Sequence, residues 1–582
     1  MVAPYRALAK NVPASRDSRG FLLCSLSLAA FLSASFATTR GQTLEQPRRA
    51  PAAEAPDEAG IPVTDPLVIA KCGACHANDG HGNIERISTA RTTPEGWQDV
   101  LRRMVLVKGM SLTPPEARTI VKYLSTHLGL APDEARPVMY DAERRIHDES
   151  DVANEELVDA CTKCHTFARA LSWRRTAGDW KQFLEGHAER YKIPPHEGAV
   201  AFFARAAPLI TPGWTGWSNR TRAQNLVGRW LVTATLNGRG KYYGEMVIEA
   251  AGAGTDDEFK TRVNLRSAKD GSALMREGRS ALYDGYAWRG RSKGGVSASA
   301  APDDPASEVR EVMCFAADQS RAEGRWFWGQ YQEFGFDVKL QRAVPDDARL
   351  LVIDGTALKT GSQGQRIRLI GDNFPGEVIP ADVNFGPDVT VRRIISHSAT
   401  EIAVEVDVSA GAQSGRRDVA FRHSSIEGAL AIYDRIDYIK ATPESTLAAF
   451  GGPGWPRGYQ QFEAIGYQRG PDGKRHTADD VQLGPVDVTW SIEVFYAPAD
   501  TKTDTVGNVS TTGFFTPAAE SPKSNFDVWV IAQAREEKDA DGKPLVGKAY
   551  LVVTVPFYTF NGRRYVRDLE RWVDDGPARA GQ

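Results

Sequence analysis

The chain has 582 residues, more than a single hydrophobic core usually supports, so several domains are expected. Its 71 Lys and Arg residues nearly balance 74 Asp and Glu residues, and the formal net charge is -3. This balance argues against a nucleic acid or an anionic membrane surface as the partner.

The N-terminal segment, residues 1–42, is predicted to be a signal peptide and leader. Basic residues precede the apolar run Phe21–Phe36, which ends in small residues. The run is shorter than the roughly 20 apolar residues of a membrane-spanning helix. Cys24 follows Leu23 rather than a small residue, which disfavours a lipoprotein cleavage site. The segment Thr43–Ile61 lacks apolar periodicity and extends the leader, so we expect export to the periplasm.

Two copies of the pattern Cys-x-x-Cys-His follow, Cys72-Gly73-Ala74-Cys75-His76 and Cys161-Thr162-Lys163-Cys164-His165. Two thiols at this spacing can each bond to one vinyl group of a porphyrin, and the adjacent imidazole is then held beneath the iron. A zinc site or a redox dithiol would not explain a His after both pairs. We therefore expect two covalently bound haem c groups, attached through Cys72, Cys75, Cys161 and Cys164, with His76 and His165 as proximal iron ligands.

The segment after each motif repeats. Arg91, Trp97 and Met104 of the first copy are separated by the same two intervals as Arg174, Trp180 and His187 of the second copy. Both stretches from the Trp to the last residue have helical periodicity, which would bring a sulfur or an imidazole to the far side of the iron. We predict Met104 as the distal ligand of the first haem and His187 as that of the second. Because a Met/His pair raises the reduction potential, the two haems would differ.

Alternatives exist for both distal ligands. Met110, just before the helix start Thr113–Glu116, competes with Met104, which could instead be a core methionine. His196 competes with His187. The remaining histidines of this region are interpreted as surface or supporting groups; they are His81, His127 and His147.

A further apolar helix face closes each unit, before Leu128 in the first and before Pro208 in the second. The helical pattern predicts an all-α dihaem cytochrome c domain over residues 63–212. Its two haem units would occupy residues 63–132 and 150–210.

Beyond about residue 212 the apolar period changes from 3.6 to 2, which predicts antiparallel β domains and a multidomain α+β chain. Residues 222–345 are expected to form a β-barrel, beginning with a hairpin that turns at Asn237-Gly238.

Two β-sandwiches are expected after the barrel, over residues 348–440 and 455–575. In the first, Ile402–Val408 alternates as a half-buried strand, and Ile367–Gly376 resembles the opening strands of immunoglobulin-like domains of the IPT/TIG type. In the second, Val486–Val494 alternates along one strand.

The β domains carry no recognisable catalytic motif, so no catalytic residue is predicted on this chain. Their histidines lie far apart in sequence and are interpreted as surface groups; they are His397, His423 and His476. Cys314 is interpreted as a buried free thiol.

Two Cys-x-x-Cys-His units followed by three β domains resemble the α subunit of quinohaemoprotein amine dehydrogenase. The most specific parts are the two motifs and the connecting stretch Tyr123–Pro132. The resemblance implies a periplasmic heterotrimer with a β-propeller subunit and a small subunit that bears cysteine tryptophylquinone. The quinone would oxidise a primary amine to an aldehyde and ammonia. This chain would pass the electrons through its haems to a soluble cytochrome c or blue copper protein.

Two other functions fit the same haem residues. A free-standing dihaem electron carrier would share them all, but it would leave the β domains without a purpose. A dihaem peroxidase needs one iron with an open or displaceable distal position, against which Met104 and His187 argue.

Overall fold

The computed structural model describes residues 60–139, 155–162, 165–194, 196–220, 226–252, 257–295, 301–327, 335–452, 457–495, 503–520 and 524–555. The predicted signal peptide lies outside these residues. Within them, no helix combines the length and the apolar character needed to cross a membrane.

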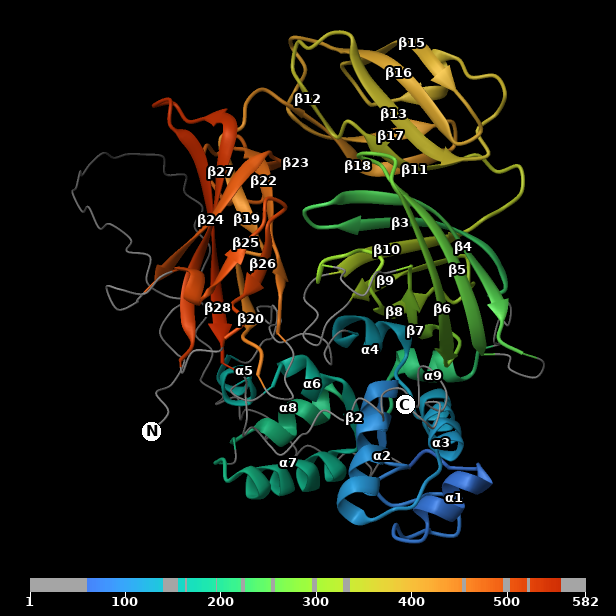
Figure 1. The fold of residues 1–582 in the computed structure, drawn as a ribbon. Helices are drawn as coiled ribbons and strands as arrows, with labels where there is room; N and C mark the ends of the chain where they lie inside the picture. The colour runs from blue at the N-terminus through green and yellow to red at the C-terminus, as the bar shows by residue number, and fades with distance from the viewer. Residues whose placement is uncertain are drawn as a thin grey trace, which may run out of the picture. The chain divides into compact units, whose positions relative to one another are not determined.

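The N-terminal part consists of two helical units with a similar order of elements (Figure 1). The first comprises α1 (Pro66–Cys72), β1 (Ala90–Thr92), α2 (Pro94–Lys108) and α3 (Pro114–His127). The second comprises α5 (Glu155–Cys161), α6 (Phe167–Leu171), β2 (Trp173–Arg175), α7 (Ala177–Tyr191) and α8 (Ala199–Ala206). Between and after them lie α4 (Pro132–Ala135), the 3-10 turn η1 (Arg136–Val138) and α9 (Pro212–Ser218).

The two central helices, α2 and α7, are 15 residues long and begin in the same way. The hydroxyl of Thr93 caps α2 and that of Thr176 caps α7, each accepting a hydrogen bond from a backbone N–H of the first turn. Each helix is followed by a residue in the left-handed region, Gly109 with φ 72° and Lys192 with φ 55°. Both helices predicted from the Trp-to-ligand periodicity are therefore present.

Tryptophans at equivalent positions of the repeat anchor α2 to the C-terminal end of α3, and α7 to the C-terminal end of α8. The indole N–H of Trp97 donates to the carbonyl of Leu128 (3.0 Å), and that of Trp180 donates to the carbonyl of Ala207 (2.9 Å). Both indoles are almost completely buried. The internal repeat is thus a repeat of packing as well as of sequence.

Strands β1 and β2 join the two units in a small antiparallel ladder, in which Arg91 lies opposite Arg174. The two guanidinium groups share one carboxylate, because Glu134 on α4 accepts two hydrogen bonds from Arg91 (2.8 and 2.9 Å) and one from Arg174 (3.3 Å). The side chain of Arg91 is fully buried, and that of Glu134 is 9% exposed. This network fixes one helical unit against the other.

Eight antiparallel strands form a closed barrel in the order β10-β3-β4-β5-β6-β7-β8-β9 (Figure 1). Their bounds are β3 Gly228–Leu236, β4 Gly240–Ala250, β5 Glu258–Ser267, β6 Ala273–Tyr283, β7 Ala287–Lys293, β8 Val309–Phe315, β9 Arg321–Phe327 and β10 Gly335–Arg342. The predicted hairpin is β3–β4. Its connection has three residues, because Leu236 pairs with Gly240.

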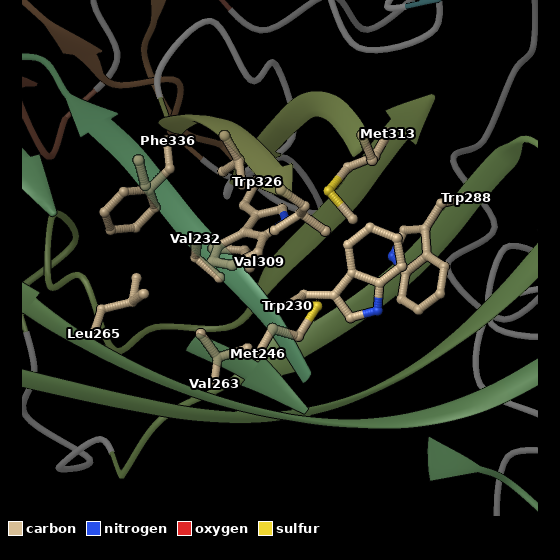
Figure 2. Packing of buried hydrophobic residues seen from close by; sticks show 14 of the residues in the cluster. Trp230, Val232, Met246, Val263, Leu265, Trp288, Val309, Met313, Trp326 and Phe336 are labelled. Atoms are coloured by element: carbon tan, nitrogen blue, oxygen red, sulfur yellow. The ribbon is translucent and has the colours of Figure 1, made fainter. Parts of the chain in front are cut away.

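Large apolar side chains fill the barrel, as Figure 2 shows for Trp230, Trp288 and Trp326. All three indoles are completely buried. An eight-stranded barrel is just wide enough for its own side chains to fill, so this domain is a packed support.

The barrel contacts the first haem unit. The Tyr286 hydroxyl donates to the carbonyl of Leu130 (2.8 Å), and Arg289 forms a buried ion pair with Glu95 at the start of α2. Cys314, on the same side of the barrel, is buried as predicted, and this burial raises the pKa of its thiol.

Two four-stranded sheets follow, β11-β13-β16-β15 and β12-β18-β17-β14, and they enclose one apolar core. The elements are β11 Arg349–Asp354, β12 Ala357–Lys359, β13 Gln365–Asp372, η2 Pro380–Asp382, β14 Val383–Asn384, β15 Val389–His397, β16 Glu401–Val408, β17 Gly415–Phe421 and β18 Ser424–Tyr433. The alternating strand predicted at Ile402–Val408 is β16.

The last β region has three sheets, β19-β22-β23, β20-β28-β27-β24 and β21-β26-β25. Its elements are β19 Tyr438–Thr442, β20 Ser445–Ala449, β21 Gln460–Gln461, β22 Glu463–Gln468, β23 Val481–Pro485, β24 Val488–Phe495, η3 Thr503–Thr505, β25 Gly507–Val509, β26 Phe514–Pro517, β27 Phe526–Lys538 and β28 Pro544–Thr554. The strand predicted from Val486 begins at Val488, because the Val486 N–H donates to the carbonyl of Ala464 in β22, a strand of another sheet.

Candidate haem-binding sites

The first Cys-x-x-Cys-His motif forms a turn at the end of α1. The backbone N–H groups of Cys75 and His76 both donate to the carbonyl of Cys72 (3.1 and 3.0 Å). Cys72 is buried, which raises the pKa of its thiol to about 11, whereas Cys75 is exposed and His76 is half-buried. The turn therefore presents two thiols and an imidazole from five consecutive residues.

The second motif begins at the end of α5 with Cys161. Cys164 lies outside the described residues. The His165 Nδ1 is 2.7 Å from the carbonyl oxygen of Thr166, a contact in which the protonated Nδ1 donates to the carbonyl. A hydrogen bond from Nδ1 to a backbone carbonyl orients the ring and fixes the tautomer that ligates a metal through Nε2.

The structure brings His165 and His187 together. Their ring centres lie 6.3 Å apart, and their planes are inclined at 76°. Two metal–nitrogen bonds of about 2 Å each, added to the distance from each nitrogen to its ring centre, sum to about 6 Å. The separation thus fits one metal ion held between the two imidazoles.

His187 lies on a face of α7 that the protein leaves largely uncovered. Its ring stacks with Phe183 at 5.8 Å and contacts Tyr191 at 4.7 Å, and these two neighbours are 37% and 38% exposed. An aromatic helix face of this kind suits contact with a flat apolar cofactor. Burial lowers the pKa of His187, as do the nearby charges of Arg190 and Arg169, and this direction favours the neutral imidazole.

Met104 and Met110 lie at the C-terminal end of α2, where the Met110 N–H donates to the Met104 carbonyl (3.0 Å). Their packing differs. Met110 packs against the apolar cluster that includes Cys72 and Leu101. Met104 is half-buried and stays outside the apolar clusters of the described residues, so its thioether is available to a ligand.

The other histidines of this region are placed differently. His196 is half-buried, and its Nδ1 has no hydrogen-bond partner within the described structure. His81 is exposed, and His127 stacks on Tyr123 with ring centres 4.5 Å apart. His147 lies outside the described residues. Among the residues that are described, no three His, Cys, Asp or Glu side chains gather into a metal-binding group.

Sequence reasoning did not identify Glu134 as a site residue. It did single out Arg91 and Arg174 by their spacing, and two buried arginines at equivalent positions of a repeat require a carboxylate. The local sequence Ala131-Pro132-Asp133-Glu134 signals a short helix but does not reveal its long-range partners.

Four family models match successive parts of the chain. Residues 63–199 match the haem-binding region of the quinohemoprotein amine dehydrogenase alpha subunit. Domains II, III and IV of the same subunit match residues 223–343, 347–434 and 439–564, respectively. No curated protein matches the chain.

Solved structures resemble parts of the chain at low identity. A de novo designed fluorescence-activating β-barrel is 17% identical and covers 21% of this chain and 96% of its own, with a TM-score of 0.16. Human protocadherin-24 EC1-2 is 12% identical, with coverages of 36% and 99% and a TM-score of 0.15. A SusE-like surface polysaccharide-binding protein from Bacteroides thetaiotaomicron is 11% identical, with coverages of 59% and 70% and a TM-score of 0.13. These likenesses carry no functional argument.

Proposed function

Because the chain belongs to the family of quinohaemoprotein amine dehydrogenase α subunits, we propose that it is the dihaem electron-transfer subunit of such an enzyme. It would take electrons from a cysteine tryptophylquinone on a small partner subunit, after oxidative deamination of a primary amine. It would deliver them to a soluble cytochrome c or blue copper protein. The chain itself would carry no catalytic residue for the amine.

The observation that carries this proposal is the 6.3 Å separation of the His165 and His187 rings. These two residues come from a motif turn and from a helix that starts 12 residues later, at Ala177. We assign them as the axial ligands of the second haem. His165 is oriented by its bond to Thr166, and His187 by the aromatic rings beside it on α7.

For the first haem we assign His76 and Met104. Met104 occupies the α2 position that matches His187 on α7, and its thioether lies outside the core that Met110 helps to fill. We assign Cys72, Cys75, Cys161 and Cys164 as the covalent attachment points. Bound haem would supply reversible one-electron chemistry at each iron.

The same proposal extends to the export, the location, the partners and the domain structure of the chain. We infer a signal peptide within residues 1–42, a periplasmic location and a heterotrimer with a β-propeller subunit. We also infer immunoglobulin-like character for the sandwich over residues 348–440, where the two sheets β11-β13-β16-β15 and β12-β18-β17-β14 share one core. The domain division 63–212, 222–345, 348–440 and 455–575 is part of the proposal.

The test is expression of the full chain in cells that assemble c-type cytochromes, followed by intact-mass and optical analysis. We expect the mass of two haems on the mature chain and a Soret band. The replacement His187→Ala should convert one haem to a high-spin spectrum, whereas His196→Ala, the matched control in the same unit, should leave both spectra unchanged. A chain with no added mass would contradict the proposal.

Partners are tested by purification from a native host. We expect this chain to copurify with a β-propeller subunit and a small quinone-bearing subunit, and to be reduced when a primary amine is added. A lone dihaem chain that no amine reduces would instead be a free-standing electron carrier.

A further inference from the structure

The β-barrel holds the first turn of the helix that carries Met104. The guanidinium of Arg289, on strand β7, donates from two nitrogens to the two carboxylate oxygens of Glu95 in the first turn of α2, one of these bonds being 3.2 Å long. The two side chains are only 6% and 19% exposed. A third nitrogen of Arg289 donates to the carbonyl of Trp288 (3.0 Å), whose indole is completely buried inside the barrel (Figure 2). The start of α2 is therefore fixed to the packed frame of the barrel.

A second barrel contact holds the segment to which α2 is anchored. The hydroxyl of Tyr286, a buried residue just before β7, donates to the carbonyl of Leu130 (2.8 Å). Two residues earlier, the carbonyl of Leu128 accepts the indole N–H of Trp97, which follows Glu95 on α2 (3.0 Å). Barrel residues three positions apart thus fix α2 both directly and through the chain that follows α3.

The C-terminal half of α2, which carries Met104, is more open to solvent. Leu106 and Val107 are 60% and 69% exposed. At a rise of about 1.5 Å per residue, Met104 lies roughly 13 Å along the helix from Glu95, so a tilt of about 5° at the first turn would displace it by roughly 1 Å. A ligand must be held more closely than this for a productive bond, so the fixed start of α2 matters at its other end.

The second unit holds its equivalent helix differently. Gly178 occupies the position on α7 that Glu95 occupies on α2, and it has no side chain to pair with the barrel. The first turn of α7 is instead paired within its own unit, where Arg175 bonds to Asp179. Support from the barrel through an acidic residue of the first turn is thus a property of the first unit.

Resting on the function proposed above, the geometry points to a positioning role: we propose that Arg289 and Glu95 hold α2 in the place from which Met104 binds the iron of the first haem. Both are positioning residues, because they act through the helix rather than at the iron. Loss of their ion pair leaves the haem attached by its thiols but weakens the bond to the sulfur. The barrel thereby supports the ligation of the first haem and not that of the second.

The experiment measures how easily an external ligand replaces the sulfur in the intact ferric holoprotein. Imidazole is titrated in while the absorption band diagnostic of sulfur-to-iron(III) bonding is followed. In Arg289→Gln we expect the apparent Kd of imidazole at the first haem to fall about tenfold, the lower end of the range for residues that orient a metal ligand. Arg289→Lys, which keeps the charge, should recover most of the wild-type value. The spectrum of the second haem should be the same in both variants.

Glu95→Gln is the second variant, because it removes the same ion pair from the helix side and keeps the size of the side chain. Arg229→Gln is the matched control, since Arg229 also joins the barrel to a neighbouring domain, through hydrogen bonds to Asp372 (2.9 and 2.8 Å). The control should leave the Kd of imidazole unchanged, even if it lowers the melting temperature.

Two outcomes would overturn the inference. One is an imidazole Kd that is the same in Arg289→Gln, in Glu95→Gln and in the wild-type protein. The other is an equal fall of the Kd in Arg229→Gln, which would make the effect one of general stability. A wild-type holoprotein without the sulfur-to-iron band would instead refute the Met104 ligation in the proposed function, so the two failures are distinguishable.

Discussion

Removal of the Glu134 carboxylate should loosen the junction of the two haem units. Glu134 accepts hydrogen bonds from Arg91, Arg174, the Thr211 hydroxyl (2.8 Å) and the Ala131 N–H (2.8 Å). Replacing it with Ala would leave the fully buried guanidinium of Arg91 without its counter-charge. Removing one partner of a buried ion pair costs about 3–5 kcal/mol, so we expect a loss of that size in the local opening free energy.

Hydrogen exchange measured by mass spectrometry reports the local opening free energy at the strands concerned, β1 and β2. At about 1.4 kcal/mol per factor of ten, the amides of β1 and β2 should exchange roughly 10²- to 4 × 10³-fold faster in Glu134→Ala. Asp133→Ala is the matched control, because Asp133 is the exposed neighbour on the same short helix, and its effect should stay within about 0.5 kcal/mol. If the two variants exchange alike, the shared carboxylate does not hold the units together.

The same carboxylate predicts a pH dependence. Burial raises the pKa of Glu134. The hydrogen bonds from Arg91 and the positive charges of Arg91 and Arg174 lower this pKa by more than burial raises it, so the net shift is downward. A carboxyl with a depressed folded-state pKa stabilises the fold above its unfolded pKa, near 4.3, and loses that contribution as the pH falls through its folded pKa. Protection of β1 and β2 should therefore fall on acidification below about pH 4, and this pH dependence should be absent in Glu134→Gln.

Three other outcomes are expected. Trp288→Ala should destabilise the barrel by about 3–5 kcal/mol in denaturant unfolding, because it empties a fully buried site, while Met275→Ala, at an exposed strand position, should have little effect. Cys314 should react with an alkylating reagent only in the unfolded chain, because it is buried and its thiol pKa is raised; rapid labelling of the native protein would contradict this. Met104→His should lower the reduction potential of the first haem and leave that of the second unchanged, as judged by redox titration. If the potential of the first haem is the same in the variant as in the wild-type protein, Met110 is the ligand instead.

Features set by neighbouring residues could be predicted from the sequence. Helices α2, α3 and α7 follow from apolar periodicity and from the caps Thr93, Thr113 and Thr176. The strand β16 follows from alternation, and the β3–β4 hairpin from its Asn-Gly turn. In each case the physical cause acts over a few residues and is therefore visible in a local pattern.

Features set by distant residues could not be predicted. The barrel itself is predicted, but the strand pair that closes it is not: β10 pairs with β3, whose residues are about a hundred positions apart, and alternation does not specify which strands meet. Glu134 and Arg91 are separated by 43 positions. Charge partners at such separations become evident only when packing brings them together.

The two helical units show how one scaffold could carry two different cofactor environments. The threonine caps, the indole-to-carbonyl bonds and the paired arginines are equivalent in both, so the backbone places residue 104 and residue 187 at matching positions on α2 and α7. In the proposed dihaem subunit, the identity of that one side chain, thioether or imidazole, would tune each iron separately. Arg169, whose charge acts on the ring of His187, also pairs with Asp99 of α2 in the first unit (3.1 Å), so the second environment would depend on the junction as well as on its own ligands. Changes in the packing of that junction, more than changes in either motif, should therefore alter the difference between the two potentials.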